Sequence, residues 1–148
     1  TLKNTGDKTI ETSVYNHNFF MIDKEPTNAN IKTTFAFDVK AEGTVRGFGT
    51  TAKIEGSSII FNRAVNASEN VFSSKMTGFG NTSEDYNIRI ENLKTKAGVH
   101  ITSDQAIDKM IFWACATTSC PEAYTKIEVP PGETLKWNIN YEFLLDIP

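Results

Sequence analysis

Hydrophobic and polar residues alternate along much of this chain, with the two-residue period of a β-strand that buries one face. Ile10, Thr12 and Val14 alternate with polar neighbours, and residues 86–92 repeat the pattern. The final strand is the clearest, because apolar side chains occupy every second position across residues 135–143. The same reasoning predicts further strands at residues 31–39, 52–54, 58–61, 71–76, 99–102, 110–116 and 124–129. The run at 110–116 is continuously apolar, which predicts a strand covered on both sides.

Turn-forming residues separate these strands. Asn4-Thr5-Gly6-Asp7 and Pro130-Pro131-Gly132-Glu133 are strong turn signals, and residues 23–30, 55–57, 81–85 and 117–121 are predicted connections. No long segment shows the 3.6-residue period of a helix. We therefore predict an all-β chain of roughly nine or ten short strands, arranged as an antiparallel β-sandwich.

Composition narrows the class of protein. The chain has 148 residues, of which 39% are hydrophobic and 22% charged, values typical of one globular domain with a substantial core. The net charge of −3 is spread without a basic stripe, so we expect no nucleic-acid partner. No apolar run is long enough to cross a bilayer, so we expect no membrane span.

Two cysteines and two histidines limit the metal and redox chemistry. Cys115 and Cys120 can pair, or they can remain two small buried thiols. The ligand spacings of a zinc site are absent, and we predict no metal and no cofactor. The first residues, Thr1 to Asn4, resemble the tail of a strand already under way, and we interpret the chain as a fragment or processed part of a longer one.

Residues 2–20 contain the strongest candidate for a functional site. A turn and a strand lead into Asn16-His17-Asn18, which is followed directly by Phe19-Phe20. Hydrogen-bonding groups set against an apolar floor suit the hydroxyl face of a sugar.

This stretch resembles the aldose 1-epimerase (galactose mutarotase) family. Members carry an Asn-His-x-Tyr/Phe-Phe motif after a strand and an Asn-Thr-type turn, and residues 16–20 match it. The Pro-Gly-Glu turn at 131–133 and the aromatic strand after it also match. Uncharacterised mutarotase-like sequences resemble the chain even more closely. The resemblance implies that residues 1–148 form part of a galactose mutarotase-like supersandwich, namely its C-terminal half.

The resemblance also implies roles for individual residues. His17 takes the place of the general acid, and Glu122, in Cys120-Pro121-Glu122, takes the place of the general base. Asp85 matches a hydroxyl-binding aspartate. Asn16, Asn18 and Trp113 are candidates for lining the pocket, with Trp113 able to stack on a pyranose. The acid would protonate the ring oxygen and the base would take the anomeric proton, from either side of the anomeric centre and without a cofactor.

Each residue also has a structural interpretation. His17 can be a loop residue bound to the backbone, Glu122 a solvated carboxylate, Trp113 a core residue and Asp85 a turn former. The family's complete site further uses an arginine and a second histidine from the N-terminal half, for which this chain has no counterpart. Half a supersandwich would also expose an apolar sheet face, so we expect a partner, either the missing N-terminal half or a second copy of the chain.

Three functions remain open from the sequence. The first is a carbohydrate-binding mutarotase-like domain, with acid–base catalysis on a free sugar when the missing N-terminal half is supplied. The second is a non-catalytic glycan-binding or accessory β-sandwich module, and the third is a purely structural or interaction domain.

Overall fold

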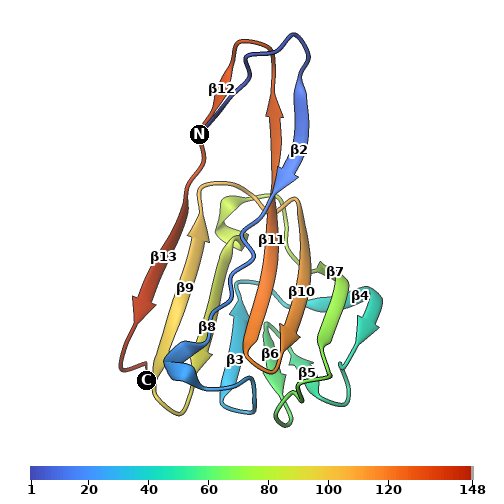
Figure 1. Ribbon diagram of the computed structural model, residues 1–148, viewed down its shortest axis with the longest axis vertical. Coiled ribbons are helices and arrows are strands. Elements are labelled where there is room, and N and C mark those ends of the chain that lie inside the picture. The colour runs from blue at the N-terminus through green and yellow to red at the C-terminus, as the bar shows by residue number, and fades with distance from the viewer. Residues whose placement is uncertain (148) are drawn as a thin grey trace.

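The fold of the chain is a β-sandwich, seen in a computed structural model that describes residues 1–147 (Figure 1). The strands of the first half are β1 (Leu2–Lys3), β2 (Ile10–Val14), β3 (Ile31–Phe35), β4 (Lys40–Arg46), β5 (Ala52–Glu55), β6 (Ser58–Phe61) and β7 (Val71–Thr77). The strands of the second half are β8 (Asn87–Asn92), β9 (Ala97–Ser103), β10 (Lys109–Cys115), β11 (Thr118–Val129), β12 (Thr134–Leu135) and β13 (Ile139–Leu144). Two single-turn 3-10 helices, η1 (Ile22–Lys24) and η2 (Ser83–Asp85), lie in connections. Within residues 1–147, no helix has the length and apolarity that crossing a bilayer requires.

The strands form two large antiparallel sheets and one small one. The five-stranded sheet has the order β2-β11-β10-β7-β4, and the six-stranded sheet has the order β13-β9-β8-β3-β6-β5. The short strands β1 and β12 pair with each other. The prediction of an all-β antiparallel sandwich is confirmed.

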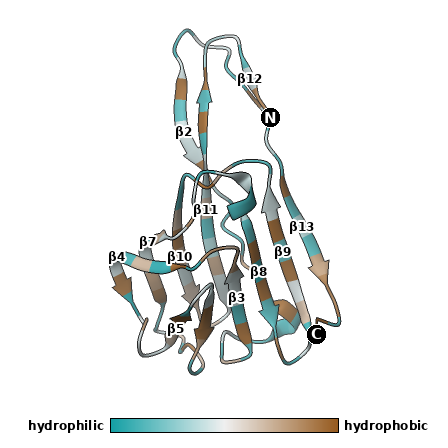
Figure 2. Cartoon of the chain, turned by 180° about the vertical axis from the view of Figure 1, so that it is seen from behind, coloured by the Kyte–Doolittle hydropathy of each residue, from teal (hydrophilic) through white to brown (hydrophobic). Residues whose placement is uncertain are grey.

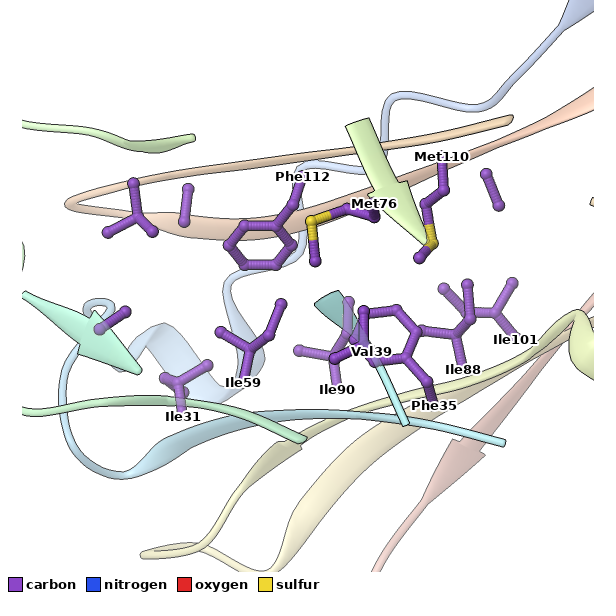
Figure 3. Packing of buried hydrophobic residues seen from close by; sticks show 14 of the residues in the cluster. Ile31, Phe35, Val39, Ile59, Met76, Ile88, Ile90, Ile101, Met110 and Phe112 are labelled. Atoms are coloured by element: carbon purple, nitrogen blue, oxygen red, sulfur yellow. The ribbon is translucent and has the colours of Figure 1, made fainter. Parts of the chain in front are cut away.

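The core lies between the two large sheets, as Figure 3 shows. Phe112, Met76 and Met110 point inward from the five-stranded sheet, and Ile59 and Ile90 are among the side chains that meet them from the six-stranded sheet. All five are at most 1% exposed. Burying a side chain of this size contributes about 1.5–3 kcal/mol, so this layer is the main source of stability.

One polar contact crosses the same interior. The hydroxyls of Thr33 in β3 and Ser119 in β11 lie 3.0 Å apart, and both residues are buried. Each hydroxyl can satisfy the other, which removes the cost of burying either one alone.

The long strand β11 has different pairing partners along its length. Its first part pairs with β10, while residues 125–129 pair with β2 in a ribbon that extends beyond the sandwich (Figure 1). At the end of this ribbon Asn4 fixes the predicted turn, because its Oδ1 accepts the Gly6 N–H at 3.0 Å and its amide donates to the carbonyls of Lys8 and Val129 at 2.7 and 2.8 Å.

The predicted connection at residues 117–121 is wrong, because β11 already begins at Thr118 and contains Pro121. Proline lacks an N–H and is tolerated where a strand has one paired neighbour. Here β11 pairs with β10 on one side, since β2 reaches only residues 125–129. The consequence is that Glu122 lies inside a strand and not in a loop.

The predicted final strand is also wrong in part, since it is divided into β12 and β13. Asn138 interrupts it: its backbone N–H and its side-chain amide bind the Asp104 carboxylate at 3.0 and 2.7 Å. Leu135, before the break, pairs with Leu2, while β13 pairs with β9. The strand predicted at 31–39 likewise ends at Phe35.

The edge strand β4 was not predicted from the sequence. It is mostly exposed, and its register with β7 shifts between Glu42 and Val45. Gly43, at the shift, has a φ of 69°. Charges and a bulge on an edge strand discourage pairing with other chains.

Candidate functional site

The candidate site lies on the outer face of the five-stranded sheet, where β10 and β11 pair. Successive side chains of a strand point to opposite faces, so Cys120, Glu122 and Tyr124 of β11 share the outer face. The register places Trp113 opposite Cys120 and Ile111 opposite Glu122. The outward-facing side chains of the paired strands β10 and β11 therefore form the floor of the site.

Residues 15–21 cover this floor. They follow β2, have no regular secondary structure and lead to η1. The Thr118 hydroxyl donates to the Phe20 carbonyl at 2.9 Å, which fixes the segment to the start of β11. Asn92 of β8 donates to the Ile22 carbonyl at 3.1 Å, which fixes the end of the segment to the other sheet. The segment therefore closes one edge of the sandwich and carries His17 onto β11.

His17 lies between two side chains of β11. Its Nε2 is 3.3 Å from Oε1 of Glu122, and its Nδ1 is 3.3 Å from Sγ of Cys120. The Glu122 side chain is 8% exposed and that of His17 is 31% exposed. The structure thus brings together the two residues for which the family resemblance implies acid and base roles, and it places them side by side.

Burial governs the ionisation of this group. Burial raises the pKa of Glu122 above its ordinary value, and the positive charge available to His17 offsets part of that increase. Burial and the neighbouring Glu122 charge raise the pKa of Cys120 to about 12, against a smaller opposing effect of the Asn18 backbone. At neutral pH Cys120 is therefore a protonated thiol, and Glu122 is a stronger base than a surface carboxylate.

Aromatic rings surround the imidazole. Phe19 stacks on His17 with ring centroids 4.3 Å apart, and Trp113 meets the imidazole edge-on at 5.4 Å. Phe19 is 68% exposed, whereas Trp113 is half-buried beneath it. Tyr15 stacks on Tyr124 at 4.2 Å next to them. Phe19 is thus the most exposed of these rings, and Trp113 packs edge-on against it at 6.2 Å between ring centroids.

Asn16 and Asn18 bind the same partner. The Asn16 amide donates to the Tyr141 hydroxyl at 2.6 Å, and that hydroxyl donates to Oδ1 of Asn18 at 3.2 Å. Tyr141 lies on β13, at the edge of the six-stranded sheet. In this structure the two asparagines, predicted to line a pocket, hold residues 15–21 against β13.

Asp85 lies in a different part of the molecule, in η2. Its Oδ2 accepts the Gly80 N–H at 3.0 Å and the Thr82 hydroxyl at 3.5 Å, both within its own connection. These contacts are those of a turn former. The second histidine, His100, pairs with Glu142 at 3.3 Å and Asn87 at 2.8 Å on the outer face of the other sheet.

Three kinds of chemistry are conceivable for His17, Cys120 and Glu122. Their donor atoms lie within 4.8 Å of one another, so among the described residues this group could hold a metal ion. However, the carboxylate and the sulfur face different ring nitrogens, and a metal bound to one nitrogen would lie on the wrong side of the ring for the other partner. A nucleophilic cysteine needs a lowered pKa and access, whereas Cys120 is 0% exposed and its pKa is raised. The geometry fits a hydrogen-bonded chain best, with the imidazole in its centre.

Sequence reasoning missed two members of the site, Cys120 and Tyr141, and it placed Phe19 in an apolar floor although this ring is 68% exposed. Both cysteines are free, and Cys120 was considered only as a thiol that pairs or packs. A strand assignment at 118–122 would have placed Cys120 and Glu122 on one face, but Pro121 indicated a loop. The role of Tyr141 follows from the sheet order, which the sequence pattern does not give.

A pocket of about 260 Å³ lies beside the site and not within it. Phe20, Met21, Phe143 and Leu145 contribute to its lining. Phe143 and Leu145 are 75% and 80% exposed, and the chain is hydrophobic where β13 ends near the C-terminus (brown in Figure 2). This apolar surface is separate from the His17–Glu122 pair.

Comparisons of the whole chain with protein-family models, with curated proteins and with solved structures find no match.

Proposed function

We propose that the chain is a mutarotase-like carbohydrate domain in which His17 and Glu122 exchange protons with the anomeric centre of a free sugar. The observation that carries the proposal is their contact: Nε2 of His17 and Oε1 of Glu122 lie 3.3 Å apart, although the residues are far apart in sequence. The motif match of residues 16–20 to the aldose 1-epimerases supports the same assignment.

His17 and Glu122 contact each other instead of standing on either side of the anomeric centre as expected, and adjacent groups can also serve this reaction. The ring oxygen and the anomeric hydroxyl are bonded to the same carbon, so adjacent groups can reach both from one side. The Nε2–H of an imidazolium at His17 is shared between Oε1 of Glu122 and the ring oxygen of the bound sugar, and its proton passes to the ring oxygen. Glu122 accepts the hydroxyl proton, and the ring opens to the aldehyde. Rotation about the bond next to the carbonyl and reclosure then give the other anomer. The raised pKa of Glu122 makes it a better base for this step.

The exposed aromatic rings offer a surface for the sugar. Phe19 and Tyr15 are 68% and 37% exposed, and their ring centroids lie 4.3 and 6.1 Å from that of His17. The apolar C–H face of a pyranose packs on such rings.

A second function, non-catalytic glycan binding, is favoured by the same exposed rings. In that case Phe19 would matter for binding, whereas proton exchange at His17 would have no consequence. The two functions therefore differ in whether sugar binding is accompanied by faster mutarotation.

The test measures the optical rotation of freshly dissolved α-galactose and α-glucose with the pure protein, together with binding by chemical-shift changes at the Trp113 indole. His17→Gln and Glu122→Gln should each reduce the acceleration by about a hundredfold or more, the range for general acid–base groups. His100→Gln is the matched control, because His100 also contacts a glutamate at 3.3 Å. Binding without acceleration would favour the glycan-binding module, and absence of both would overturn the carbohydrate assignment.

The expected partner also remains a proposal. The missing half of a mutarotase-like fold, or a second copy of the chain, would supply substrate-orienting groups and cover apolar surface such as Phe143 and Leu145. Sedimentation velocity at high concentration tests the second copy, and a monomer throughout would contradict it.

A further inference from the structure

The Cys120 thiol occupies the one ring nitrogen of His17 that Glu122 does not. Sγ lies 3.3 Å from Nδ1, and Oε1 of Glu122 lies 3.3 Å from Nε2. Both partners come from the same face of β11, two positions apart. The imidazole is therefore held at both nitrogens by one strand.

The chemistry of the three groups fixes the direction of the hydrogen bonds. An ionised carboxylate only accepts, so Nε2 must carry a hydrogen when it contacts Glu122. A neutral imidazole has a single N–H, which leaves Nδ1 as an acceptor and requires a donor there. The thiol is that donor, and its pKa of about 12 keeps it protonated.

A thiol also suits the other protonation state of the ring. When His17 gains a proton, Nδ1 becomes a donor, and the sulfur can rotate its hydrogen away and accept weakly. Cys120 is 0% exposed, so no water competes for either role.

We propose that Cys120 is a positioning residue, whose thiol holds the His17 ring with Nε2 towards Glu122 by donating to Nδ1 of the neutral imidazole. Its contribution to catalysis rests on the proposed function, whereas the hydrogen bond itself does not. Among the described side chains, the titratable groups around His17 are Glu122 and Cys120 from β11 and Tyr15 from its own segment. Tyr124 and Lys109 lie one step further along the paired strands.

The test observes the thiol directly. The S–H stretching band is recorded by infrared spectroscopy as the pH is varied across the range in which the protein stays folded. The Cys115→Ala variant removes the other thiol, which is half-buried and lies next to Thr117. The Cys120 band should move in one step as His17 loses its proton and Nδ1 becomes an acceptor. The step should disappear in His17→Gln and persist in His100→Gln.

Substitutions at Cys120 provide the second readout. Cys120→Ser keeps a donor and an acceptor and should retain most activity, whereas Cys120→Ala should lower kcat by up to about a hundredfold with a smaller change in KM. A Cys120 band without a pH step would overturn the proposal, as would equal activity of the alanine and wild-type proteins if the chain accelerates mutarotation. A pH step in a chain that does not act on sugars would uphold the positioning contact and refute only the proposed function.

Discussion

Replacing Thr33 with valine tests how β11, the strand that carries Cys120 and Glu122, is fastened to the opposite sheet. Valine has nearly the shape of threonine, so the main change is the loss of one hydroxyl. The Ser119 hydroxyl, 3.0 Å away and buried, would then have lost its described partner. An unsatisfied buried hydroxyl costs about 1–3 kcal/mol, more than the net contribution of an ordinary hydrogen bond.

This cost translates into a measurable shift. For a chain of 148 residues, about 3 °C of melting temperature corresponds to 1 kcal/mol, so Thr33→Val should lower Tm by about 3–9 °C. Urea denaturation followed by the fluorescence of the two tryptophans gives the free energy of unfolding. Ser119→Ala should also lower the free energy of unfolding, because it removes the described partner of the buried Thr33 hydroxyl.

The double variant decides whether the reasoning is right. With both hydroxyls removed, neither residue of this pair leaves an unsatisfied polar group, and the free energy of unfolding should return to within about 1 kcal/mol of the wild-type value. If the two single losses simply add, the hydroxyls are not coupled and the contact between β3 and β11 does not act as described.

Two further predictions concern the site and the turns. Because burial raises the pKa of Glu122 above 4.5, the folded chain holds this proton to a higher pH than the unfolded chain, and the residue lowers stability increasingly as pH rises through that window. Glu122→Gln should therefore raise Tm at pH 7 but not at pH 4; an equal gain at both values would contradict the assignment. Gly78 and Gly132 have φ values of 121° and 81°, and a Cβ at Gly78 would collide with the Asp38 carbonyl, whereas one at Gly132 would meet nothing within 4 Å. Gly132→Ala should thus cost about 1–2 kcal/mol in urea denaturation and Gly78→Ala clearly more, and equal costs would refute the packing argument.

The sandwich could be predicted from the sequence because apolar and polar residues alternate along the strands, and this alternation indicates which face of each strand is buried. Ile88 and Ile90 alternate with polar neighbours and are both 1% exposed in the core. The boundaries were less predictable wherever a tertiary contact decides them. The strand predicted at 135–143 breaks because Asp104, remote in sequence, binds Asn138.

The site was predictable only in part for a similar reason. His17 and Glu122 were selected through a family resemblance, and the structure brings them into contact. Cys120 was not selected, because Pro121 suggests a turn to any argument based on local preference. That preference is overridden here by pairing with β10, which keeps residues 118–124 extended. Asn16 and Asn18 face Tyr141 only because β13 lies at the sheet edge.

The pairing of a side chain from residue 17 with two from a strand that starts at Thr118 has a consequence for folding kinetics. Nearly the whole chain must be ordered before the imidazole meets its partners, and contacts of such long sequence separation form slowly because their loop-closure entropy is paid first. A partly folded molecule can contain most of its strands and still lack the site. The appearance of the His17–Cys120 hydrogen bond during refolding would therefore report the formation of the long-range topology, later than signals from local hairpins such as β5–β6.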